Sequence, residues 1–164
     1  MPKQGFSGQP ILRPFRSAQS CELWTLMNTV YYVSQDGRTY EAPRGMLTDL
    51  ASIPALAGGL FRGVDHRLPG VIHDARYLLS PVTGEKRADL DSLFAEMCLL
   101  QGASPLQGKA LHAGLDLGGW HAWDDCQAAG VTWGDFDVSV LTDEEVADYR
   151  VRFKIPDLQP RRRA

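Results

Sequence analysis

Residues 87–101 read RADLDSLFAEMCLLQ, and this stretch decides the fold. Its apolar side chains recur at the i, i+3, i+4, i+7 spacing that marks one face of an α-helix. They are Leu90, Leu93, Phe94, Met97 and Leu100. Gly102 follows and is a natural C-cap, because glycine readily adopts the left-handed conformation that ends many helices. The pattern predicts a helix over 87–101 with one buried face.

Two further helices are predicted on either side of this one. Residues 68–79 have Pro69 near the first turn, where proline is tolerated, and an apolar face that includes Val71 and Ile72. Residues 81–84 (PVTG) are predicted to be a connector. Downstream, Ser104 followed by a proline is typical of a helix start. That third helix is predicted to weaken at the two glycines at 118 and 119.

The region before these helices favours β-structure. Residues 22–33 are rich in β-branched and aromatic side chains, which suit a strand. Asp36-Gly37 is a typical hairpin turn, and residues 39–42 (TYEA) are predicted to return as the second strand. The predicted fold class is therefore α+β, with a β-hairpin or small antiparallel sheet packed on a body of about three α-helices.

The chain of 164 residues is divided by composition into three parts. Residues 1–20 are rich in Gly, Pro, Gln and Ser and are predicted to be an extended arm. Residues 21–125 are predicted to form a single α+β domain. Residues 126–164 form a C-terminal extension, in which TDEE at 142–145 resembles a capping box that opens a short helix. Residues 151–154 are read as a closing strand or an extended tail, before a basic end.

Composition excludes several classes of protein. The formal net charge of −3 argues against a general nucleic-acid binder, which is usually basic. Residues 1–14 lack the apolar core of a signal peptide, and no stretch reaches the ~18 apolar residues that a membrane span needs. Cys21, Cys98 and Cys126 show no CxxC spacing, so we expect a reducing compartment, with Cys98 as a buried thiol.

Three polar patches set in apolar sequence suggest a shared site. They are TDLASIP at 48–54, His73-Asp74, and Ala88-Asp89. Asp and His are costly to bury without partners, so we predict that Asp49, His73 and Asp89 meet as catalytic residues. The chain has no HExxH, P-loop, GxSxG or GxGxxG motif, which favours a metal-activated water as the reagent. Together with Asp74, the three would ligate a divalent metal ion of the Zn or Mg/Mn class.

Each of these residues also has a structural interpretation. Thr48 or Asp49 can cap the turn before Pro54. His73 can be a core histidine with a hydrogen-bond partner, and Asp89 can stabilise a helix N-terminus. Two more histidines, His112 on the third helix and His121 between tryptophans, are secondary candidates for ligands.

The same motifs resemble an uncharacterised protein family of phages and prophages, known as the domain of unknown function number 1353. The resemblance lies in residues 48–54, in His73-Asp74 with Tyr77, and in residues 87–89 (RAD) with Phe94, and it covers roughly residues 40–122. It implies a phage or prophage origin and no activity. The resemblance also implies synthesis in the host cytoplasm, followed by association with the virion.

Two hypotheses of different classes follow. In the first, the protein is a metal-dependent hydrolase that acts on cell-envelope polymer, with the host cell envelope as its target. In the second, it is a virion structural or adaptor protein, a tail or head–tail component. Its partners are then other virion proteins, and the Asp/His cluster is structural.

Overall fold

The computed structural model describes residues 3–16, 23–50, 63–137 and 139–153. In these residues two three-stranded antiparallel sheets combine with five α-helices, which confirms the predicted α+β class. In the described part of the chain, no helix is both long and apolar enough to cross a membrane.

Each sheet contains one short strand from the N-terminal arm. The first sheet has the order β1-β4-β5, with β1 (Gly5–Phe6), β4 (Val30–Val33) and β5 (Thr39–Ala42). The second has the order β2-β3-β6, with β2 (Leu12–Pro14), β3 (Trp24–Leu26) and β6 (Leu47–Thr48).

The predicted hairpin is confirmed as β4 and β5. Tyr32 pairs with Tyr40, and Gly37 in the turn has a φ of 84°, a conformation that favours glycine. The β-favouring run predicted over 22–33 forms two strands in its described residues, because the chain bends after Leu26 and β3 and β4 join different sheets. At the bend, the Met27 amide donates to the Ile11 carbonyl at 2.8 Å. Ile11 directly precedes β2, so this bond joins Met27 to the second sheet rather than to the first.

The described residues of the arm are held by the sheets rather than extending away from them. Strand β1 pairs with β4, and β2 pairs with β3. The Gln4 side chain also donates to Glu96 in the second predicted helix at 3.1 Å, and Glu96 accepts from the Tyr32 hydroxyl at 2.6 Å. The arm therefore completes the β-layer.

The three predicted helices are confirmed, and a fourth follows the third directly. The helices are α1 (Arg67–Thr83), α2 (Arg87–Leu100), α3 (Pro105–Gly118), α4 (Trp120–Ala128) and α5 (Asp143–Phe153), with a short 3₁₀ turn η1 (Trp133–Asp135) before α5. Residues 120–128, which form α4, mix Trp, Asp and small residues without a helical apolar pattern. Ser104 caps α3 as predicted, since its side chain accepts from the Gln107 amide while Gln107 accepts from the Ser104 amide.

Helix α1 is longer than predicted, because proline does not end it. Pro81 has no N–H to donate to the carbonyl of Tyr77 four residues earlier. The Ser80 hydroxyl donates to that carbonyl instead, at 2.7 Å. The helix then ends at Gly84, whose φ of 72° is the left-handed conformation of a C-cap. The prediction of a connector at 81–84 is therefore wrong for its first three residues.

Helix α5 begins next to the predicted capping box, and residues 151–153 belong to it rather than to a strand. The candidate site lies outside this helix.

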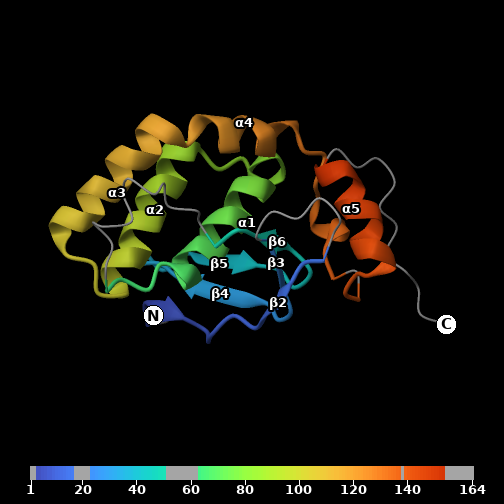
Figure 1. Cartoon of the computed structure of the whole chain (residues 1–164). Coiled ribbons are helices and arrows are strands. Elements are labelled where there is room, and N and C mark those ends of the chain that lie inside the picture. The colour runs from blue at the N-terminus through green and yellow to red at the C-terminus, as the bar shows by residue number, and fades with distance from the viewer. Residues whose placement is uncertain (1–2, 17–22, 51–62, 138, 154–164) are drawn as a thin grey trace.

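Helix α1 is the centre of the molecule. It contacts β4, β5 and β6 on one side and α2 and α4 on the other, and α3 packs on the outside of α2 (Figure 1). The largest buried apolar side chains of this core come from β3 and β4, from the residue before β6, and from α1 and α2. They are Tyr32, Phe94, Leu26, Met46, Ile72, Leu79, Leu90 and Met97.

Candidate functional site

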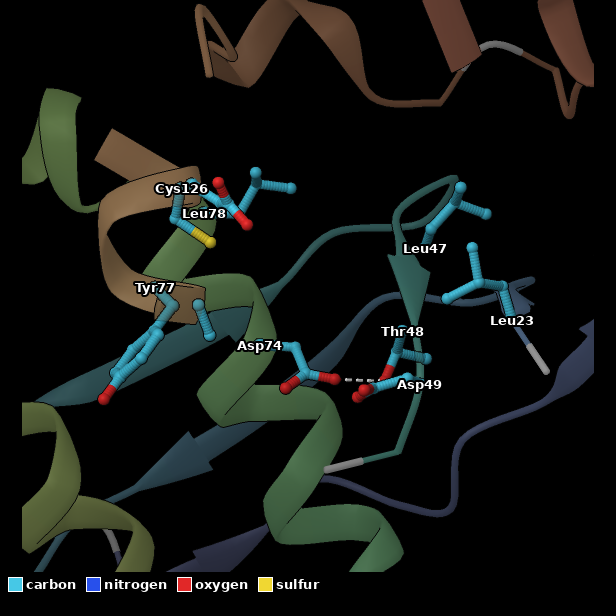
Figure 2. Close-up of a pocket in the computed structure, with 10 residues that line it drawn as sticks. Leu23, Leu47, Thr48, Asp49, Asp74, Tyr77, Leu78 and Cys126 are labelled. Carbon is cyan, nitrogen blue, oxygen red and sulfur yellow. Dashed lines mark hydrogen bonds between the residues drawn. The ribbon is translucent and has the colours of Figure 1, made fainter. Parts of the chain in front are cut away.

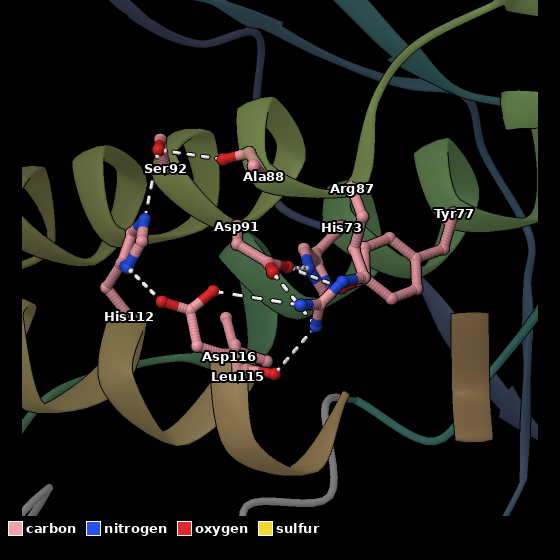
Figure 3. A network of polar contacts seen from close by, with 9 residues as sticks. All are labelled: His73, Tyr77, Arg87, Ala88, Asp91, Ser92, His112, Leu115 and Asp116. Atoms are coloured by element: carbon pink, nitrogen blue, oxygen red, sulfur yellow. Dashed lines mark hydrogen bonds and ion pairs between the residues drawn. The ribbon is translucent and has the colours of Figure 1, made fainter. Parts of the chain in front are cut away.

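The predicted site residues divide between two regions on different sides of α1. His73 belongs to a buried network with Tyr77, Arg87 and Asp91, which we call the buried network (Figure 3). The other region is a cavity that we call the acidic pocket.

The buried network centres on Asp91. Its Oδ1 lies 3.2 Å from His73 Nε2 and also accepts from the Tyr77 hydroxyl. The side chain of His73 is 6% exposed and that of Asp91 is 0% exposed. The second carboxylate oxygen, Oδ2, lies 3.6 Å from Arg87 Nη1. Oδ1 therefore meets donors from α1, whereas Oδ2 is buried without a hydrogen bond among the described residues and has only the charge of Arg87 beside it.

Helical spacing explains how these side chains meet. His73 and Tyr77 lie four residues apart on α1, and Arg87 and Asp91 lie four residues apart on α2, so each pair shares a helix face. The His73 ring packs 4.1 Å from the Tyr77 ring and 4.9 Å from the Phe94 ring, centre to centre. This packing leaves little room for a substrate at His73.

Arg87 extends the network to α3. Its Nη1 donates to the Leu115 carbonyl at 2.9 Å, and its Nη2 lies 3.8 Å from Asp116 Oδ1. Asp116 in turn lies 3.2 Å from His112 Nδ1, and the other ring nitrogen of His112 lies 3.1 Å from the Ser92 hydroxyl. One arginine therefore connects α2 to the C-terminal end of α3.

The network holds Asp91 in its charged form. Burial acts to raise the pKa of Asp91, but the hydrogen bonds with His73 and Tyr77 and the nearby charge of Arg87 outweigh it, so the pKa is below its ordinary value. Burial, followed by the hydrogen bond to Asp91, raises the pKa of Tyr77. Tyr77 therefore remains a neutral donor to a carboxylate at neutral pH.

The acidic pocket lies on the other side of α1, between β6 and α4 (Figure 2). Its volume is about 370 Å³. Three aspartates from three different elements line it, together with a thiol, a threonine, a tyrosine and apolar side chains. These residues are Asp49, Asp74, Asp125, Cys126, Thr48, Tyr77, Leu23, Leu47, Leu78 and Ala122.

Thr48 organises one wall of the pocket. Its hydroxyl donates to Asp74 Oδ2 and accepts from the Leu50 amide, the second contact at 2.9 Å. This is the capping role that the sequence allowed for Thr48, and it ties β6 to α1 (Figure 2). Asp49, the next residue, is exposed at the pocket. Residues 51–54 of the predicted motif lie outside the described residues.

The pKa of Cys126 reflects the negative charge of the acidic pocket. Burial raises the pKa of its thiol to about 12, and the charges of Asp74, Asp125 and Asp49 act in the same direction. A thiol with such a pKa is neutral at physiological pH and a poor nucleophile. The pocket therefore offers negative charge rather than a reactive cysteine. The predicted burial of Cys98 is confirmed, and burial also raises its pKa to about 12.

The structure does not bring the predicted catalytic residues to one centre. His73 lies in the buried network, Asp49 and Asp74 lie at the acidic pocket, and Asp89 is exposed on α2. His121 is exposed on α4. In residues 3–16, 23–50, 63–137 and 139–153, no group of three or more His, Cys, Asp or Glu side chains is arranged to hold a metal ion.

Asp91 is the residue that the sequence reasoning missed. It lies four residues after Arg87 and three before Phe94, so helical spacing places it at the edge of the apolar face of α2. A carboxylate in that position, with an arginine one turn before it, was the available signal. Asp125 at the pocket carries no comparable pattern, because only the packing of α4 on α1 brings it there.

Comparison with known proteins identifies a family. The model of the family described as "Protein of unknown function (DUF1353)" matches residues 24–115. A search of curated proteins and a search of solved structures found no match. The matched residues run from β3 into α3 and include Asp49, His73, Asp74 and Asp91, whereas Asp125 and Cys126 lie beyond them. Since the match covers more than half of the chain, the protein belongs to the DUF1353 family.

Proposed function

We propose that the protein is a structural or adaptor component of a phage or prophage virion, in the tail or at the head–tail junction. In this proposal it binds another virion protein through the acidic pocket. The observation that carries the proposal is the burial of His73 and its contact with Asp91. Its ring is buried, and its Nε2 faces Asp91 at 3.2 Å, so it holds helices together rather than facing a substrate.

The pocket supports a partner with a basic side chain. The carboxylates of Asp74 and Asp125 line it from α1 and α4, and that of Asp49 lines it from the residue after β6. Leu47 and Leu78 supply an apolar wall. Lysine and arginine have apolar stems and cationic heads, so one such side chain can satisfy both kinds of lining. The chemistry of the pocket therefore favours a Lys or Arg presented by a protein surface.

The phage context rests on the motif resemblance of residues 48–54, 73–77 and 87–94. Under this proposal the protein is made in the host cytoplasm and then incorporated into the particle. Incorporation at a fixed ratio to the other virion proteins distinguishes a structural component from an enzyme needed in small amounts.

Mass spectrometry of purified particles tests the proposal directly. We expect the protein at fixed stoichiometry in wild-type particles and a strongly reduced amount when Asp74→Asn and Asp125→Asn are combined. Asp89→Asn is the matched control, because Asp89 is an exposed carboxylate that does not line the pocket. Absence of the wild-type protein from particles contradicts the proposal.

A second candidate is the metal-dependent hydrolase acting on cell-envelope polymer. The observation that favours it is the presence of Asp49 and Asp74 at one open cavity, since carboxylate oxygens suit Mg²⁺ or Mn²⁺ and also bind Zn²⁺. In this candidate the reaction takes place in the acidic pocket, and His73 has only a structural role. Cell-envelope polymer must then be cleaved in a metal-dependent way.

Metal binding separates the two candidates. Titration calorimetry of the full chain with Zn²⁺ and with Mn²⁺ should show binding that Asp49→Asn and Asp74→Asn weaken if the hydrolase candidate holds. No binding of either ion, together with intact envelope polymer after incubation, rules it out and leaves the adaptor proposal standing.

A further inference from the structure

The outer face of α3 carries an apolar stripe that faces away from α2. Its members are Leu106, Ala110, Ala113 and Leu117, which fall within an arc of about 60° at 100° per residue. Leu106 is 74% exposed and Leu117 is 87% exposed. The buried contacts of the helix, through Gly108 and Leu111, lie on the opposite side, and Figure 1 shows α3 on the outside of α2.

The spacing of this α3 stripe is symmetric. Its four residues are separated by four, three and four positions, so the order large, small, small, large is the same in both directions. An interface between two identical chains related by a two-fold axis must be self-complementary. When two copies of the stripe run antiparallel, Leu106 of one copy lies opposite Leu117 of the other, and the two alanines lie opposite each other.

Small residues at the middle of the stripe favour this pairing further. Ala110 and Ala113 let two helices approach closely, while the leucines at each end cover the contact. The helix has 14 residues and is about 21 Å long, and the stripe covers most of that length.

Charges beside the stripe have the same symmetry. Lys109 and Asp116 lie seven residues apart, two turns along one flank, and both are exposed. In an antiparallel two-fold pair, equivalent flanks face each other, so Lys109 of one copy lies opposite Asp116 of the second copy, twice. Gln107 and Gly114, on the other flank, carry no charge. A parallel two-fold arrangement would instead place this charged flank opposite the uncharged flank of Gln107 and Gly114, so neither ion pair would form.

We infer that α3 is a homodimer interface, in which two copies of this chain pair antiparallel through Leu106, Ala110, Ala113 and Leu117 and through two Lys109–Asp116 ion pairs. The inference goes beyond the proposed function, because the stripe and the acidic pocket lie on different elements. A dimer would present two acidic pockets, one from each copy.

Sedimentation equilibrium or light scattering on the full chain tests the interface. The wild-type protein should have twice the 18.1 kDa chain mass, and Leu117→Glu should raise the dimer dissociation constant by about tenfold or more. Ile11→Glu is the matched control and should leave the mass unchanged. Ile11 is an apolar residue that directly precedes β2 and is 61% exposed. Circular dichroism checks that both variants are folded.

Charge reversal gives an independent readout. Lys109→Glu alone and Asp116→Lys alone should each weaken the dimer, and the two together should restore it, because the ion pairs re-form with reversed sign. Asp116 also contacts Arg87 and His112 within its own chain, so thermal unfolding of each variant controls for the loss of those contacts. A monomeric mass of the wild-type protein at concentrations up to about 0.1 mM overturns the inference. A dimer that neither Leu117→Glu nor the single charge reversals weaken overturns it as well. Neither result bears on incorporation into particles, so the test is separate from that of the proposed function.

Discussion

The buried network and the acidic pocket begin from adjacent residues of α1, His73 and Asp74, yet they differ in almost every physical respect. Neighbouring helix positions project about 100° apart, so His73 faces α2 while Asp74 faces β6. In the network a buried carboxylate accepts hydrogen bonds at one oxygen and lies beside the charge of Arg87 at the other. At the pocket, three carboxylates of like charge surround a cavity.

This difference separates folding from binding. Asp91 has the ring nitrogen of His73 and the Tyr77 hydroxyl within hydrogen-bonding reach and Arg87 beside it, so its charge stabilises the contact between helices. The like charges at the pocket oppose one another, although Asp74 accepts a hydrogen bond from Thr48, and a bound cation would relieve this repulsion. Tyr77 belongs to both regions, since its hydroxyl contacts Asp91 and its side chain also lines the pocket.

The largest effect is expected from Asp91→Ala. This change leaves His73, Tyr77 and Arg87 without their shared acceptor and should lower the free energy of unfolding by about 3–5 kcal/mol. Urea denaturation followed by circular dichroism measures it. Asp89→Ala, two residues earlier and exposed, should change stability by no more than about 0.5 kcal/mol. Equal effects of the two variants would show that the network does not support the fold.

A smaller loss is expected from Tyr77→Phe. The change removes the hydroxyl that donates to Asp91 and keeps the ring that packs on His73 and on Trp123. We expect a decrease of about 1.5–3 kcal/mol, the range for a hydrogen bond to a charged group. Thermal unfolding gives the value. A neutral result would mean that the donor is dispensable and that ring packing alone carries the role of Tyr77.

Acid should weaken the buried network. The pKa of Asp91 is lower in the folded protein than in the unfolded chain, where carboxyls of aspartate titrate near about 3.9. Its stabilising contribution is therefore present above that pH and is lost as the pH falls through the lower, folded value.

Urea denaturation at several pH values between neutral and strongly acidic measures this effect. The wild-type protein should lose more stability in acid than Asp91→Asn does, because the variant has no carboxylate to protonate at this position. Parallel curves for the two proteins would contradict a charged Asp91.

The smallest effect on stability is expected at the pocket. Asp49→Asn removes a charge at an exposed position, and Asp74→Asn keeps an oxygen that can accept from Thr48, so each should change stability by less than about 1 kcal/mol. Thermal unfolding of the two variants measures this. The same variants should reduce binding of a basic partner, whereas Asp89→Asn, outside the pocket, should not. A large loss of stability in Asp74→Asn would show that Asp74 mainly stabilises the fold rather than binding a partner.

Local sequence was sufficient for most of the helices and for the hairpin. The apolar spacing of 87–101 placed α2, the serine and proline at 104 and 105 placed the start of α3, and Asp36-Gly37 placed the turn between β4 and β5. These features depend on contacts within a few residues. The errors lie where distant contacts decide. Residues 22–33 contribute to two sheets because β3 pairs with β2 and β6, whereas β4 pairs with β1 and β5. The extension of α1 through Pro81 is a local exception, since Ser80 supplies the missing donor to Tyr77.

The candidate site was only partly predictable. The sequence by itself determined that polar side chains lie among apolar ones near His73, because burial and helical spacing are local properties of α1 and α2. Tertiary structure alone decided which carboxylate His73 meets, because that depends on how α2 packs against α1, and the answer is Asp91 rather than Asp89. It also decided that Asp125 joins Asp49 and Asp74, since those residues come from elements far apart in the chain.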